Sequence, residues 1–103
     1  MSDELTIELT EAGDRGRYEA QVEGSDATAE LTYRRLSEEL IVAEHTIVPK
    51  AFRGRGIAAA LVRKLVDDAR KKDLKILPQC SYVQSAFERH PEWQDLLAEQ
   101  ATD

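Results

Sequence analysis

Hydrophobic and polar residues alternate along the first half of the chain. Over residues 17–24, the apolar members of the alternation are Tyr18, Ala20 and Val22, and polar residues occupy the positions between them. The same alternation recurs over residues 27–33, and residues 6–9 add either a short first strand or an extended arm. Glycines and charged residues separate these stretches, which is typical of tight turns. The pattern predicts strands that run back and forth through short connections.

Residues 40–48 are apolar on both faces of an extended chain. One face carries Leu40, Val42 and Val48, and the other carries Ile41, Ala43 and Ile47. A strand with this pattern is typically buried on both faces. We therefore expect a central strand that is covered on both sides.

The apolar period becomes helical from residue 56 onward. Over residues 56–72 it repeats at every fourth position, at Ile57, Leu61, Leu65 and Ala69. Residues 74–78 then indicate a short buried strand. Residues 81–90 indicate a second helix, in which Ser81 and Gln84 are spaced as a capping box. Pro91 ends that helix and can begin a further short one.

The length of 103 residues predicts one domain over residues 1–103. Strands come first, and a helix, a strand and a second helix follow. The expected fold class is α/β, or α+β, with helices packed on a sheet.

Composition and charge narrow the class of protein. The formal net charge is −6, so nucleic acid is not the expected partner, because phosphate neutralisation needs a basic face. The apolar runs are only a few residues long, and the acidic start lacks the layout of a signal peptide, so we expect no membrane span. The single cysteine, Cys80, allows no internal disulfide and fits a cytoplasmic location. No histidine and cysteine pair has the spacing of a metal site, so we expect no metal.

A basic, glycine-containing stretch, VPKAFRGRGIAAALV, lies where the first helix is expected to begin. It matches the dinucleotide fingerprint G-x-G-x-x-[GA] at Gly54, Gly56 and Ala59. That fingerprint should follow its strand at once, whereas residues 49–53 intervene here, and no acidic residue follows the next strand. The sequence of a P-loop is absent. A nucleotide fold of either kind is therefore disfavoured.

The same stretch also matches the pattern [QR]-x-x-G-x-[AG] at Arg53, Gly56 and Ala58. The first turn of a helix has unpaired N–H groups and a partial positive charge, and small residues let an anion approach them. Arginines at this end of a helix are unfavourable without a partner, and a diphosphate would supply one. The alternative is a helix start whose arginines are simply solvated.

In this loop and in the order of its elements, the segment from His45 to Pro91 resembles the GNAT superfamily of N-acetyltransferases, and within it a minimal subfamily of very short proteins. The resemblance implies a mixed, mostly antiparallel sheet of about five strands, with helices packed on both faces and without the last two strands of larger members. It implies that the chain binds acetyl-CoA or CoA as a co-substrate and moves an acetyl group to an amine. It implies that backbone groups near Thr46 and Val48 pair with the pantetheine arm. It also implies a pyrophosphate cradle formed by Arg53, Gly54, Arg55, Gly56, Ile57 and Ala58, with the amides of the last four as donors.

The catalytic residues are less clearly marked. Larger GNAT enzymes often protonate the departing thiolate with a tyrosine of the second helix, and the matching position here is Phe87, which carries no proton. Cys80 is the first candidate, because amides at the start of a helix lower a thiol pKa; it could accept the acetyl group or protonate the thiolate. His45 is the second candidate, as a general base or as the group that orients the thiol, and we expect it on the same face as Ile41. Glu44 is a weaker candidate base.

Both leading candidates also have a purely structural interpretation. Cys80 would then be a small buried residue, and His45 a hydrogen-bonded core histidine.

Two functions fit these residues. The first is an acetyltransferase acting on an amine; glutamates in the antiparallel region favour a cationic acceptor. The second is a CoA-binding or protein-interaction module with little catalysis, which Phe87 favours. The sequence does not indicate the oligomeric state.

Overall fold

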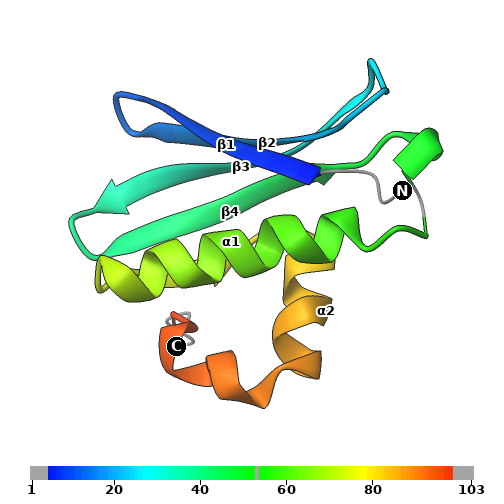
Figure 1. The fold of residues 1–103 in the computed structure, drawn as a ribbon. Coiled ribbons are helices and arrows are strands. Elements are labelled where there is room, and N and C mark those ends of the chain that lie inside the picture. The colour runs from blue at the N-terminus through cyan, green and yellow to red at the C-terminus, as the bar shows by residue number, and fades with distance from the viewer. Residues whose placement is uncertain (1–4, 53, 99–103) are drawn as a thin grey trace.

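The computed structural model of the chain describes residues 5–52 and 54–98. Five strands form one sheet in chain order (Figure 1), with the bounds β1 Leu5–Ala12, β2 Arg15–Val22, β3 Thr28–Ser37, β4 Leu40–Ile47 and β5 Lys75–Pro78. Neighbours from β1 to β4 are antiparallel, whereas β5 is parallel to β4. The expected mixed, mostly antiparallel sheet is confirmed.

Helix α1, Ile57–Lys71, makes the crossover between the two parallel strands. Such a crossover is needed because the chain must return to the same end of the sheet before β5 can begin. A short 3₁₀ helix, η1 Lys50–Phe52, precedes α1, and α2 Ser81–Arg89 and a second 3₁₀ helix, η2 Pro91–Leu96, follow β5. Among the described residues, no helix is long and apolar enough to cross a bilayer.

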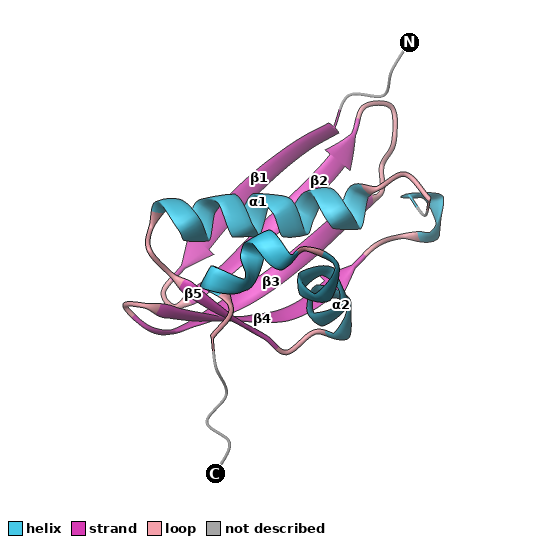
Figure 2. Cartoon of the chain, turned by 90° about the horizontal axis from the view of Figure 1, so that it is seen from below, coloured by secondary structure: helices cyan, strands magenta, loops and turns pink. Residues whose placement is uncertain are grey.

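The helices α1, α2 and η2 pack on one face of the sheet. Figures 1 and 2 show α1, α2 and η2 on the same side of the strands. Side chains from all three join one hydrophobic core with the sheet. Within the described ranges no helix covers the other face, which we call the open face. The expectation of helices on both faces, and of a central strand covered on both sides, is therefore wrong in this detail.

The covered face is built by the alternation in β2 and β3. Tyr18 on β2 and Leu31 on β3 are almost fully buried against the apolar stripe of α1, which includes Leu61 and Leu65. Burying a side chain of this kind contributes about 1.5–3 kcal/mol. The period of two in the strands and the period of 3.6 in the helix therefore fix which faces meet.

Strand β4 contains a β-bulge at Glu44. Thr32 pairs with His45, but the next residue of β3, Tyr33, pairs with Ala43, so Glu44 has no partner in this ladder. One extra residue reverses the side to which the following side chains point. His45 consequently lies exposed on the open face. The expectation that it shares the buried face is wrong, and the bulge is the reason.

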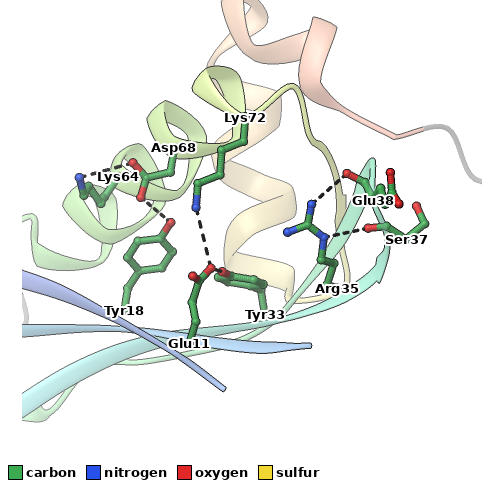
Figure 3. Close-up of polar contacts among 9 residues, drawn as sticks. All are labelled: Glu11, Tyr18, Tyr33, Arg35, Ser37, Glu38, Lys64, Asp68 and Lys72. Carbon is green, nitrogen blue, oxygen red and sulfur yellow. Dashed lines mark hydrogen bonds and ion pairs between the residues drawn. The ribbon is translucent and has the colours of Figure 1, made fainter. Parts of the chain in front are cut away.

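Tyr18 ties the sheet to α1, and Tyr33 ties β3 to β1 (Figure 3). Tyr18 Oη donates a hydrogen bond to Asp68 Oδ2 of α1 at 2.7 Å, and Tyr33 Oη donates to the Glu11 carboxylate on β1. Lys72, at the end of α1, holds its Nζ 3.8 Å from the same carboxylate. Burial raises the pKa of both tyrosines, and the neighbouring carboxylates raise it further. Both hydroxyls therefore stay protonated as donors well above neutral pH.

We expect the free energy of unfolding to fall steeply in alkali. The pKa of each tyrosine is raised in the folded state, so its stabilisation is complete below the ordinary tyrosine pKa of about 10 and is lost as the pH rises toward the folded value. Each tyrosine adds about 1.4 kcal/mol per pH unit to that decline. Urea unfolding across alkaline pH should show a shallower decline in the double variant Tyr18→Phe, Tyr33→Phe. Equal slopes in the two proteins would contradict the account.

Candidate functional site

A pocket of about 380 Å³ opens where the end of β4, the start of α1 and the start of α2 meet. It is lined by Thr46, Val48, Phe52, Gly54, Gly56, Ile57, Ala58, Ala59 and Tyr82. Thr46 points to the helix side because it pairs with the core residue Leu31 beyond the bulge. The bulge that turns His45 away from the helices thus turns Thr46 toward the pocket.

The edge of β4 that faces β5 is paired only along its first half. β5 pairs with residues 40–43, and the amides of Gln79 and Cys80 then both donate to the carbonyl of Ala43, at 3.0 and 3.1 Å. Beyond that point the chain turns into α2. In the described part of the chain, residues 44–47 therefore have no strand beside them on this edge. Alternate N–H and C=O groups of such an edge point outward, where an extended ligand can pair with them.

The start of α1 is shaped for an anion. Gly56, its N-cap, has φ +74°, and Gly54 has φ +80°, a left-handed conformation that glycine adopts readily. A Cβ on either glycine would meet no atom within 4 Å, so both border open space. The hydrogen bond from Ala60 N–H to the Gly56 carbonyl (3.0 Å) is the first of the helical ladder, so the amides of residues 57–59 have no acceptor within the helix. With no acidic residue in the first turn, these amides and the helix dipole favour a bound anion.

The structure gathers most of the predicted cofactor-binding residues at this pocket. Those that line it are Thr46, Val48, Gly54, Gly56, Ile57 and Ala58. Arg53 lies outside the described residues. Arg55 is exposed, and its amide donates to the carbonyl of Phe52 at 3.3 Å, so its part in the cradle stays a prediction. Ala59, whose amide also has no acceptor within the helix, lines the pocket as well.

Cys80 lies beside the pocket as the N-cap residue of α2. The predicted capping box of Ser81 and Gln84 does not form, because Gln84 Nε2 donates instead to the Pro78 carbonyl at 3.1 Å. Half-buried Cys80 holds its Sγ 3.5 Å from Thr46 Oγ1. The candidate thiol and a residue of the pocket wall are therefore in contact.

The surroundings of Cys80 favour its thiolate. Burial raises the pKa of the thiol, but hydrogen bonding with the Thr46 hydroxyl and with the amides of Val83 and Tyr82 outweighs burial, so the pKa lies below its ordinary value. Amides at the start of a helix stabilise a thiolate in this way. The position of Cys80 just before the second helix predicted this lowering of its pKa.

Removing the Thr46 hydroxyl is expected to raise the pKa of Cys80. The neutral thiol donates to Thr46 Oγ1, whereas the thiolate accepts a hydrogen bond from that hydroxyl, so the hydroxyl favours the charged form. The pH dependence of Cys80 alkylation by iodoacetamide should shift to higher pH in Thr46→Val and stay close to wild type in Thr46→Ser. An unshifted midpoint in Thr46→Val would show that the hydroxyl does not act on the thiol.

Tyr82 is a pocket residue that sequence reasoning missed. It is half-buried, lies on the first turn of α2, and lines the pocket. Phe87, at the position that the family resemblance marks for a proton donor, is only 2% exposed and packs edge-on against Trp93 at 5.6 Å between ring centroids. Helical spacing places Tyr82 off the apolar face that carries Val83 and Phe87, but it does not indicate that Tyr82 reaches the pocket.

The other catalytic candidates lie away from the thiol. The open face has a depression of about 640 Å³ whose lining includes Thr32, Glu44, His45 and Ile47. Glu44 Oε2 lies 3.8 Å from Arg34 Nε. Thr46, which contacts Cys80, lies on the helix side of β4. His45 lies on the open face, so it cannot orient that thiol. The structure separates the two predicted catalytic residues onto opposite faces of the sheet.

Comparison with known proteins agrees with this geometry. A family model described as GCN5-related N-acetyl-transferase matches residues 17–96. The chain is 31% identical to Protein NATD1 of Xenopus tropicalis over 91 aligned residues, and the alignment covers 88% of this chain and 84% of that protein. It is 32% identical to Protein NATD1 of Homo sapiens over 77 aligned residues, and that alignment covers 75% of this chain and 68% of that protein.

Two solved structures share the fold. The NMR solution structure of a GCN5-like protein from Staphylococcus aureus superimposes with a TM-score of 0.68 at 26% identity, over 91% of this chain and 90% of that one. The crystal structure of a GNAT family acetyltransferase from Elizabethkingia anophelis superimposes with a TM-score of 0.65 over 96% of this chain and 78% of that one, and at 15% identity it supports the fold alone. With a family match across most of its length and the expected loop at the start of α1, the chain belongs to the GCN5-related N-acetyltransferase family.

Proposed function

We propose that the chain binds acetyl-CoA in the pocket between β4, α1 and α2 and transfers its acetyl group to an amine. The observation that carries the proposal is the start of α1, where two glycines and the first-turn amides border that pocket. Family membership supports it, and the neighbour from Elizabethkingia anophelis is described with acetyl-CoA bound. The expected cytoplasmic location stays a prediction.

The pyrophosphate fits the start of α1. Its oxygens need several donors and little steric bulk, and the amides of residues 57–59 with the bare Cα atoms of Gly54 and Gly56 offer both. The cradle gains the positive end of a helix of 15 residues. By family resemblance, we also assign Arg53 and Arg55 to the loop that binds the pyrophosphate.

The pantetheine arm fits the unpaired edge of β4. An extended chain bearing amide groups pairs with the edge of a sheet as an added strand would. The edge formed by residues 44–47 lies between Ala43, where the β5 ladder ends, and Val48 in the pocket wall. The thioester end of such a ligand would then lie near Thr46.

Residues near Thr46 supply the proton chemistry. Acetyl-CoA provides a thioester whose carbonyl carbon is attacked by a deprotonated amine, with the CoA sulfur leaving as a thiolate. Cys80 is placed to give its proton to that sulfur, and its lowered pKa makes the transfer easier. Tyr82 is the second donor in reach of the pocket. Alternatively, the Cys80 thiolate takes the acetyl group itself and passes it to the amine.

The open face is the side from which an amine acceptor can reach the gap beside β4. Glu19, Glu30 and Glu44 line its depression, together with His45. Arginines lie 3.5–3.9 Å from all three carboxylates, so a cationic amine would replace Arg17 or Arg34 beside them, and an exposed histidine can remove a proton from it. His45 thus keeps a proposed role as general base, but on the acceptor side and not beside the thiol.

Two assays test the proposal. Calorimetric titration with acetyl-CoA and CoA should show binding, and release of free CoA thiol in the presence of small amines and peptides should show transfer. Cys80→Ala is expected to reduce turnover with little change in the dissociation constant, whereas Ser85→Ala, at an exposed position on α2, should change neither. Absence of binding at millimolar ligand would refute the proposal. Full turnover by Cys80→Ala would refute the role of the cysteine and leave Tyr82→Phe as the next variant to assay.

A CoA-binding module with little catalysis is the second candidate. The observation that favours it is the burial of Phe87 in the core, which leaves no hydroxyl at the position where larger members carry their proton donor. Tight binding without turnover on any amine would support the module over the enzyme.

A further inference from the structure

The outer edge of β1 is an unpaired sheet edge. β1 stands first in the strand order and pairs only with β2, so one row of its backbone N–H and C=O groups has no strand partner among the described residues. Proteins usually protect such an edge with charged side chains, above all lysine, or with a proline, a bulge or a very short strand. β1 is eight residues long, LTIELTEA, contains neither proline nor lysine, and pairs with β2 without a register shift; its charged residues are Glu8 and Glu11. Its edge is therefore open to another strand.

An apolar row runs along the helix side of this edge. Leu5, Ile7 and Leu9 pair with the core residues Val22, Ala20 and Tyr18 of β2. These three side chains lie on the covered face of the sheet. Because α1 packs over β2 and β3, it covers them only on the side that faces β2. Leu5 is 38% exposed, and Ile7 and Leu9 are half-buried. A strand added at this edge would bury all three further.

The sequence of β1 is complementary to itself in one register. When a two-fold axis perpendicular to the sheet relates two copies, their helices stay on one side and residues of like parity stand opposite each other. An axis at Ile7 sets Leu5 against the partner's Leu9 and Glu8 against the partner's Thr6. An axis at Glu8 would set two carboxylates directly opposite, which is destabilising.

A register centred on Leu9 is also poor. An axis at Leu9 would set Ile7 against the partner's Glu11, which is already held by Tyr33 and Lys72. An axis at Thr6 would also pair Leu5 with the partner's Ile7, but it overlaps only residues 5–7 of β1, whereas the Ile7 register overlaps residues 5–9. The Ile7 register is therefore the longest one that pairs apolar with apolar side chains and separates the acidic ones.

We propose that β1 pairs antiparallel with β1 of a second copy around an axis at Ile7, joining the two sheets of five strands into one continuous sheet. We choose a second copy as the partner because the apolar and charged residues of β1 are complementary to those of β1 itself. The formal net charge of −6 on each copy opposes the association, so added salt should strengthen it. The start of α1 lies outside this interface, so the proposal stands apart from the proposed activity.

Sedimentation equilibrium of the full chain from micromolar to millimolar concentration tests the dimer. Wild type should double its mass with concentration, and Leu5→Lys should stay monomeric. Leu36→Lys, which changes an equally apolar exposed residue (50%) on β3, should dimerise as wild type does. A monomer at every concentration, or a dimer that Leu5→Lys leaves intact, would overturn the proposal; the latter outcome would place the contact elsewhere.

Disulfide trapping tests the register, in a Cys80→Ser background so that no other thiol competes. Cysteine at position 7 faces its own copy across the axis, where opposed Cβ atoms lie about 4.5–5.5 Å apart. Cysteine at position 9 faces position 5 of the partner, and two such cysteines would lie about 13 Å apart. Under a mild thiol oxidant, Ile7→Cys should form a covalent dimer and the matched Leu9→Cys should not. Equal crosslinking of both variants, or of neither, would overturn the register.

Discussion

Replacing Gly56 with valine is expected to weaken acetyl-CoA binding by about a hundredfold or more, which corresponds to about 2.7 kcal/mol. Gly56 is the N-cap of α1 at φ +74°, and the space beside its Cα is open. A valine side chain would fill the space assigned to the pyrophosphate and would strain the left-handed backbone from which the first-turn amides are presented. Isothermal titration calorimetry measures the change directly.

Gly24→Val is the matched control for strain. Gly24 has φ +87° in the β2–β3 turn, a Cβ there also meets nothing within 4 Å, and the residue does not line the pocket. Both variants should lose similar thermal stability, but only Gly56→Val should lose binding. Equal affinities in the two variants would show that the start of α1 does not hold the ligand.

Gly16→Ala is expected to destabilise the fold by about 3 kcal/mol. Gly16 pairs with Tyr33 across β2 and β3, and a Cβ at this position would lie 2.2 Å from the Tyr33 ring. The ring cannot swing aside freely, because its hydroxyl is bonded to Glu11 and its face packs near Tyr18, with centroids 6.0 Å apart. Urea denaturation measures the loss.

A double-mutant cycle isolates this contact. In a Tyr33→Leu background, which removes most of the ring, Gly16→Ala should cost little or should stabilise, since alanine is better than glycine within a strand. An equal loss in both backgrounds would show that the clash with Tyr33 is not the cause.

Periodicity alone predicted the order of strands and helices. The alternation in β2 and β3 and the fourfold repeat of α1 arise from burial on one face, and burial is what the structure shows for Tyr18, Leu31 and Leu61. The ends of β1 and β3 were missed, because their last residues are exposed on both faces and leave no apolar pattern.

The bulge in β4 explains the largest error at the site. Nothing in the sequence around Glu44 departs from a strand pattern, because a bulge depends on which residues of the neighbouring strand find partners. Because Glu44 is an extra residue in the β3–β4 ladder, His45 points to the open face and Thr46 points toward Cys80. The number of covered faces was also misjudged, since apolar residues such as Val42 are buried on the open face without a helix above them.

The cofactor loop was more predictable than the catalytic residues. Glycine at positions 54 and 56 has a local cause, the left-handed backbone before α1, and local causes leave a sequence signal. The proximity of Tyr82 to the pocket depends on how α2 packs against β4 and α1, and no spacing within α2 encodes that.

Amide chemical-shift mapping on addition of acetyl-CoA tests the central claim most directly. The largest shifts are expected at Gly54, Gly56 and residues 57–59, with a second group at Thr46 and Val48 along the unpaired edge of β4. The same experiment with CoA should reproduce the first group, since the pyrophosphate is common to both ligands. Shifts confined to the open face around Thr32 and His45, or no shifts at saturating ligand, would contradict the account.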